Sequence, residues 1–201
     1  MGNQYFRLGR RKKQALIILV LLCLLLVSCN APVNTESDQD LAPPPTTDLN
    51  AIGELPVTRA EFIYELSPKV FGKSYQPPVA TDPVFNDLNG HWAEDLIEAF
   101  ANEGFIAGYP DGTFRPDNLI SRAEASVVLL KAKYGSSYSP PSPIGGVFAD
   151  IDSHWAQSWI EALAAEGVID SQAVSNFRPA DEITQGEIIV WVMQVFGESQ
   201  E

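Results

Sequence analysis

The sequence has 201 residues, 45% of them hydrophobic, and its 26 acidic and 13 basic residues give a formal net charge of −13. All 26 acidic residues lie beyond residue 29 and five basic residues precede it, so residues 30–201 carry a charge of −18. Such an acidic chain lacks the positive charge with which proteins bind nucleic acid, and anionic lipid surfaces would repel it. We therefore expect no nucleic-acid partner.

Residues 1–28 are predicted to be a lipoprotein signal peptide. Five basic residues precede an apolar run, Ala15–Val27, which has the length of a secretory core segment and is short for a membrane-spanning helix. The run leads into Leu26–Cys29, which resembles the lipobox of bacterial lipoproteins. That resemblance implies removal of the preceding segment and a diacylglycerol on the Cys29 thiol, which would anchor the chain to a membrane of the cell envelope, outside the cytoplasm. The alternative is an uncleaved signal anchor.

Residues 29–56 are predicted to be a lipid-anchored, disordered tether. Residues 34–40 are polar and acidic, Pro43–Pro45 is stiff and extended, and the apolar residues follow no period. Fully extended, such a segment reaches about 80 Å. Because the only other cysteine, Cys23, lies in the signal peptide, no disulfide is expected and the domain beyond the tether depends on its own core.

From residue 57 onward the chain repeats itself at a fixed step of 63 residues. The first motif, Phe85, Asp87, His91, Trp92 and Ala93, returns as Phe148, Asp150, His154, Trp155 and Ala156. A fixed step indicates one supersecondary unit used several times, which usually means an interaction scaffold. The step divides the chain into a partial repeat that is only a second half (57–82), a full repeat (83–145) and a repeat that is degenerate in its second half (146–201).

Each full repeat is predicted to contain two helices joined by a turn. Ala93, Leu96, Ile97 and Phe100 have the spacing of one apolar helix face, and Gly104 follows where a C-cap glycine belongs. The turn occupies residues 108–113, which are rich in turn-forming residues. The second helix is expected to start at Ser121.

A capping box precedes the second helix of each repeat. In this box the hydroxyl of Ser or Thr accepts from the amide three residues later, and a Glu at that position reaches back to the first amide. The three boxes are Thr58/Glu61, Ser121/Glu124 and Thr184/Glu187.

The first two boxes place Arg59 and Arg122 at the first helical position. A guanidinium beside unpaired helix-end amides is a plausible carboxylate site, because both groups donate to one anion. The alternative is that each arginine pairs with a neighbouring acid of this acidic protein.

At these residues the sequence resembles the S-layer homology (SLH) family. The family signature runs Phe-x-Asp, His-Trp-Ala, a helix, Gly-Tyr-Pro-Asp-Gly-Thr-Phe-x-Pro and Thr-Arg-Ala-Glu, and residues 84–130 match it almost position for position. Residues 147–195 match the first half well. In their second half residues 170–176 replace the Gly-Tyr-Pro-Asp-Gly turn, and Gln185-Gly186 replaces Arg-Ala.

The resemblance implies an all-α fold in which three repeats surround a pseudo-threefold axis as a three-pronged spindle. It also implies binding of cell-wall polysaccharide, commonly a pyruvylated secondary polymer linked to peptidoglycan, in grooves between adjacent repeats. Arg59 and Arg122 would contact the anionic sugar, whereas the uncharged Gln185 predicts a weak or silent third groove. The other motif positions near such grooves are Asp87, Trp92, Tyr109, Asp111, Gly112, Asp150 and Trp155.

Other residue patterns favour structural roles. His91 and His154 are predicted to be packed or capping residues rather than metal ligands, and Trp159 and Trp191 to be core residues. Trp92 and Trp155 fit the core and a groove wall equally. Asp111–Thr113 lacks the alternating ligands and closing Glu of a calcium loop. We found no catalytic motif, and expect neither enzyme activity nor a cofactor.

The sequence thus predicts a non-enzymatic, lipid-anchored protein of the cell envelope that binds wall polysaccharide and so ties a membrane to peptidoglycan. The alternative is an envelope protein–protein interaction module whose repeats have lost sugar binding. An oligomer is possible on either reading, because the first repeat is incomplete and another chain could complete it.

Overall fold

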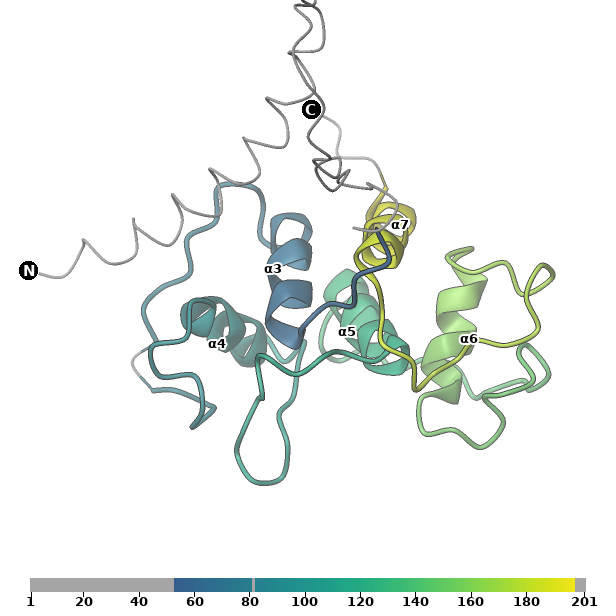
Figure 1. The fold of residues 1–201 in the computed structure, drawn as a ribbon, viewed down its shortest axis with the longest axis horizontal. Helices are drawn as coiled ribbons and strands as arrows, with labels where there is room; N and C mark the ends of the chain where they lie inside the picture. Colours follow the sequence, from purple (N-terminus) through teal and green to yellow (C-terminus); the bar gives the residue numbers. More distant parts are fainter. Residues whose placement is uncertain (1–52, 81, 198–201) are drawn as a thin grey trace, which may run out of the picture. The chain divides into compact units, whose positions relative to one another are not determined.

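The computed structural model describes residues 53–80 and 82–197, all within one compact unit of the chain. These residues form helices α3 (Arg59–Val70), α4 (Glu94–Asn102), α5 (Arg122–Tyr134), α6 (Gln157–Ala165) and α7 (Gln185–Phe196), with isolated β-bridges but no strand (Figure 1). The all-α prediction is confirmed for this part of the chain. Cys29, the signal peptide and nearly all of the predicted tether lie outside the described residues. None of the described helices is long and apolar enough to cross a membrane.

Helices α3, α5 and α7 begin at the three predicted capping boxes. The Thr58 hydroxyl accepts from the Glu61 amide at 3.2 Å, and the Glu61 carboxylate accepts from the Thr58 amide at 3.0 Å. The same reciprocal pair of bonds precedes α5 and α7. Four local residues therefore set the start of each helix, as the sequence predicted.

Helices α4 and α6 begin at the predicted histidine motifs. The Ala93 amide donates to His91 Nδ1 and the Ala156 amide donates to His154 Nδ1, each at 3.2 Å. Each histidine ring therefore bonds to a backbone amide at the helix entry, although the N-cap residues Ala93 and Ala156 themselves make no side-chain capping bond. Gly104, just after the C-cap of α4, has a φ of +73°, which confirms the predicted helix stop because a left-handed backbone favours glycine there.

Three backbone hydrogen bonds form a closed ring that joins the three repeats. The amide of Val57 donates to the carbonyl of Ile183 at 3.1 Å, that of Ile183 to Ile120 at 3.0 Å, and that of Ile120 to Val57 at 3.0 Å. Each of these residues immediately precedes a capping box, and each side chain is buried. The ring therefore places the N-terminal ends of α3, α5 and α7 beside one another.

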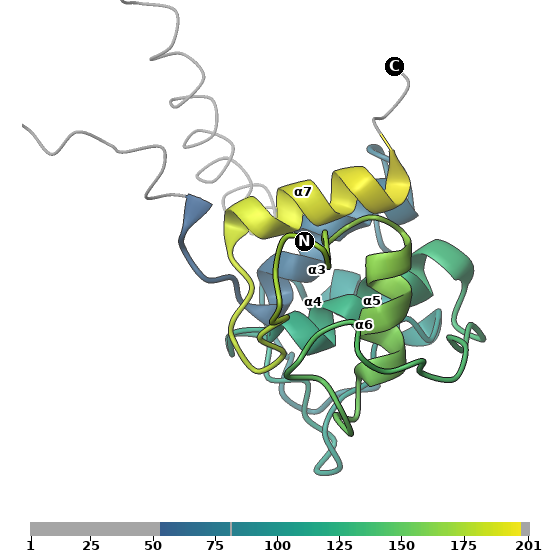
Figure 2. The same cartoon turned by 90° about the vertical axis from the view of Figure 1, so that its right-hand side faces the viewer.

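The three helices that follow this ring also pack against one another. Helix α3 contacts α5 and α7, α5 contacts α7, and the turned view in Figure 2 shows α7 alongside α3. Helix α4 packs on α3, and α6 packs on α5. Trp191 is buried and Trp159 packs against the core, as predicted. The largest fully buried side chains are Phe62, Phe100, Phe114, Phe148 and Phe177.

Helix α7 has an uncovered apolar face. Within residues 53–80 and 82–197, no helix packs on α7 in the way that α4 packs on α3 and α6 on α5. Ile63 and Ser126 occupy one repeat position on α3 and α5 and are buried, whereas Ile189 at the same position of α7 is 50% exposed. Val190 and Met193 beside it are also exposed. The half repeat that would cover this face has no counterpart among the described residues.

Candidate functional site

Arg59 links α3 to the following repeat. Its Nε donates to the Phe114 carbonyl at 2.9 Å, and its Nη1 donates to Glu124 Oε1 at 2.8 Å. The buried guanidinium lies 4.4 Å from the centre of the Phe114 ring. One side chain thus joins the first box, the turn of the next repeat and the second box.

Arg122 makes the same contacts one repeat later. Its Nε donates to the Phe177 carbonyl at 2.8 Å, its Nη1 forms an ion pair with Glu187, and the guanidinium lies over Trp191 at 5.0 Å. Burial lowers the pKa of Arg122, while the Glu187 carboxylate acts in the opposite direction. Both arginines therefore pair with the box glutamate of the next repeat. This ion pairing is one of the two alternatives that the sequence allowed, the other being ligand binding.

The third capping box, which starts α7, has no arginine at its first helical position. Gln185 stands where the other boxes have arginine, and burial raises the pKa of Glu65 while the Gln185 side chain acts in the opposite direction. The Gln185 backbone amide donates to the Leu55 carbonyl at 2.9 Å. The third box therefore lacks, at this position, the buried ion pair that Arg59 and Arg122 make.

Two surface grooves lie beside the arginines. The first groove is lined in part by Arg59, Ile63, Tyr109, Glu124, Lys131 and Trp155. The second groove is lined in part by Arg122, Asp170, Val174, Arg178, Glu187 and Trp191. Of the predicted site residues, the structure therefore brings Arg59, Tyr109 and Trp155 together in the first groove and places Arg122 in the second.

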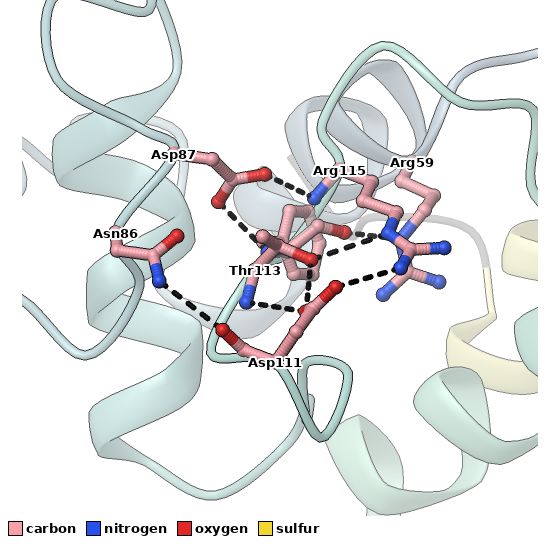
Figure 3. Close-up of polar contacts among 7 residues, drawn as sticks. Arg59, Asn86, Asp87, Asp111, Thr113 and Arg115 are labelled. Carbon is pink, nitrogen blue, oxygen red and sulfur yellow. Dashed lines mark hydrogen bonds and ion pairs between the residues drawn. The ribbon is translucent and has the colours of Figure 1, made fainter.

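Asp87 and Asp150 hold turns and line neither groove. The two carboxylate oxygens of Asp87 accept from the amides of Phe114 and Arg115 at 2.8 and 2.7 Å (Figure 3). Arg115 has a φ of +59°, an unfavourable conformation for a residue with a side chain, and these bonds stabilise it. Asp150 makes the same two bonds in the next repeat. These aspartates thus position the carbonyl groups that the box arginines contact.

Asp111 and Gly112 shape the turn beside the first groove. The Asp111 carboxylate accepts from the Thr113 hydroxyl at 2.6 Å, from the Thr113 amide at 3.0 Å and from Arg115 Nη2 at 2.9 Å, and these contacts lower its pKa to about 2 (Figure 3). Gly112 has a φ of +81°. The Arg115 guanidinium lies 3.9 Å from the centre of the Tyr109 ring. Within the described parts of the chain, no group of three His, Cys, Asp or Glu residues is placed to hold a metal ion.

The two motif tryptophans lie in different surroundings. Trp155 is 65% exposed and lines the first groove. Trp92 is 44% exposed and lies edge-on to Tyr64 at 5.7 Å, lining neither groove. Only Trp155 is therefore a groove wall, a distinction that the sequence did not make.

Sequence reasoning missed several polar residues. Glu98 is 1% exposed and accepts from the amides of Val84 and Phe85 at 2.8 and 3.1 Å, and Glu161 has the same role one repeat later. A glutamate recurs at the same position of the apolar face in the first helix of both repeats, and this recurrence could have indicated a buried structural acid. Lys131 in the first groove had no such signal, because its counterpart one step later is Gln194.

Comparison with known proteins identifies the repeats. A model of the S-layer homology domain matches residues 84–126 and 147–189, one step of 63 apart. The cellulosome-anchoring protein of Acetivibrio thermocellus is 37% identical over 111 residues, covering 54% of this chain and 25% of that protein. The S-layer protein of Bacillus licheniformis is 34% identical over 108 residues, covering 53% and 12%. S-layer protein EA1 of Bacillus anthracis is 30% identical over 121 residues, covering 60% and 14%. The chain thus spans a quarter or less of the length of these relatives.

Proposed function

Because residues 84–126 and 147–189 are S-layer homology repeats, we propose that this protein is a non-enzymatic module that binds the cell wall. The relatives named as cellulosome-anchoring and S-layer proteins support a place at the cell surface. The observation that carries the proposal is the pair of grooves between successive repeats, each lined by a box arginine. A groove of this kind binds an anionic polymer locally, on a chain whose overall charge of −13 would repel it.

We propose that the repeats form the three-pronged spindle implied by the family resemblance. The closed ring of Val57, Ile120 and Ile183 and the mutual packing of α3, α5 and α7 support this arrangement. Two prongs would hold α4 and α6, and the described residues supply no helix for the third. The corresponding domains are the partial repeat 57–82, the full repeat 83–145 and the degenerate repeat 146–201.

The proposed ligand is a wall polysaccharide that carries carboxylates, such as a pyruvylated secondary polymer linked to peptidoglycan. Arg59 and Arg122, the box arginines of the two grooves, are the candidate contacts for its carboxylates. A guanidinium has five N–H donors, and the described hydrogen bonds of Arg59 use three of them, so its ion pair with Glu124 leaves donors for a ligand. Tyr109 and Trp155 supply apolar wall to the first groove.

Sedimentation with purified sacculi tests the arginine assignment. The Arg59→Gln/Arg122→Gln double variant is expected to lose roughly tenfold or more in affinity, because it removes the box arginine from both grooves and with it the charge-assisted hydrogen bonds to the polymer. Acid stripping of the secondary polymer from the sacculi should remove binding of the wild-type protein. Undiminished binding after either change would overturn the assignment. Circular dichroism separates lost binding from lost folding.

The proposed anchor is a lipid on Cys29, with residues 1–28 removed and residues 29–56 acting as a tether between membrane and wall. Metabolic labelling with a fatty acid is expected to mark the wild-type protein and to leave Cys29→Ala unlabelled. Cys23→Ala is the matched control and should keep the label, because Cys23 lies in the segment to be removed. Equal labelling of the Cys29→Ala variant would exclude this site.

The uncovered face of α7 favours a second candidate function, an envelope protein–protein interaction module. Ile189, Val190 and Met193 expose an apolar surface that another chain could cover. This function requires binding to an envelope protein in wall-free extract and no sedimentation with sacculi. A self-associating module also requires a mass above that of one chain by light scattering, which a monomeric mass would contradict.

A further inference from the structure

The first and second grooves differ in charge. The first groove is lined by the cations Arg59 and Lys131 and by a single carboxylate, Glu124. The second groove is lined by Arg122 and Arg178 and by two carboxylates, Asp170 and Glu187. A carboxylate ligand is therefore attracted by an excess positive charge in the first groove alone.

Neighbouring carboxylates also form ion pairs with Arg178, the exposed arginine of the second groove. Arg178 Nη1 lies 3.5 Å from Asp181 Oδ2, and Arg178 Nη2 lies 3.9 Å from Glu187 Oε1. The same Glu187 oxygen pairs with Arg122. An incoming anion would have to compete with both carboxylates for these two arginines. In the first groove, Glu124 pairs with Arg59. Among the described residues, Lys131 forms no salt bridge.

The grooves also differ in exposed aromatic surface. In the first groove Trp155 is 65% exposed, and the Tyr109 ring has the Arg59 and Arg115 guanidinium groups 5.3 and 3.9 Å from its centre. The position of Tyr109 is taken by Gln172 in the next repeat. The aromatic residue of the second groove, Trp191, is buried and packs against Phe177. Only the first groove thus offers an open ring face to a sugar.

From these differences, and resting on the proposed function, we infer that each chain binds one anionic sugar, in the first groove. The sugar ring packs on Trp155, and its carboxylate lies between Arg59 and Lys131. The second groove keeps the same arginine position, but there Arg122 shares the Glu187 carboxylate with Arg178, and a second carboxylate, Asp170, cancels the excess positive charge.

Isothermal titration with a methyl hexoside that carries a 4,6-pyruvate ketal tests this inference. The wild-type protein is expected to bind one equivalent, and the same hexoside without the ketal should not bind. Lys131→Gln and Trp155→Ala should each weaken binding by about tenfold or more, because each removes a direct contact. Two equivalents, or undiminished affinity in either variant, would overturn the inference.

Matched variants in the neighbouring repeat serve as controls. Trp92→Ala removes the tryptophan one step of 63 earlier, and Arg178→Gln removes the exposed arginine of the second groove, so both should bind like the wild type. A tenfold loss in Arg178→Gln would place the ligand in the second groove. If the wild-type protein sediments with sacculi but the ketal does not bind, this inference fails while the proposed function stands. If the wild-type protein binds neither sacculi nor the ketal, both the inference and the proposed function are overturned.

Discussion

Replacing Glu98 with alanine is expected to lower the free energy of unfolding by about 4 kcal/mol. The Glu98 side chain is buried on α4 and accepts from the amides of Val84 and Phe85. Alanine leaves both amides without an acceptor, at about 1–3 kcal/mol each, and leaves a cavity beside the core. Urea unfolding followed by tryptophan fluorescence measures the change.

Glu103→Ala is the control for this experiment. Glu103 is an exposed acid at the C-terminal end of the same helix, and its removal should change the free energy of unfolding by less than about 0.5 kcal/mol. Glu161→Ala should lower stability less than Glu98→Ala, because Glu161 accepts from the amides of Ile144 and Gly145, two exposed residues whose amides can bond to water instead. Equal stability of the Glu98→Ala and Glu103→Ala variants would show that the buried carboxylate is not needed to hold this segment.

The Gly108→Ala variant is expected to lose about 3 kcal/mol of stability and to bind sacculi less tightly. A Cβ on Gly108 would lie 2.5 Å from the Thr113 carbonyl oxygen and 2.4 Å from Phe85 Cε1. The Thr113 carbonyl cannot move freely, because it accepts from the Tyr109 amide at 2.8 Å. The turn would have to open, and Tyr109 would move away from the first groove. Thermal unfolding and sacculus sedimentation measure the two effects.

Gly53→Ala is the matched glycine control. A Cβ on Gly53 would meet no atom within 4 Å, so we expect a change of less than about 1 kcal/mol and unchanged sedimentation. Wild-type stability and binding in Gly108→Ala would mean that the turn adapts to a methyl group. The close packing of Gly108 would then have no role in shaping the groove.

Local features of this fold were predictable from the sequence, because they depend on residues close together in the chain. The capping boxes at Thr58, Ser121 and Thr184 need only the glutamate three residues later, and each starts a helix. Gly104 ends a helix because of its own backbone conformation. The positions of these features required no knowledge of tertiary packing.

The candidate site depends on contacts that the sequence does not show. Glu124, the partner of Arg59, lies in the next repeat, so the residue types alone left ion pairing and ligand binding equally open. Trp92 and Trp155 occupy the same motif position, and only the neighbouring segments distinguish them: Tyr64 lies against Trp92, whereas Trp155 lines the first groove. A repeat pattern predicts equal surroundings, but the repeat position of Tyr64 is taken by Val127, which lines the first groove with Trp155.

The ring of hydrogen bonds has a consequence for the order of folding. Two of its three bonds involve Ile183, so a nascent chain that ends before the third box can form only the bond between Ile120 and Val57. Contacts between residues so far apart form late, since a long loop must close first. We therefore expect the three central helices to assemble only after the last repeat has been synthesised.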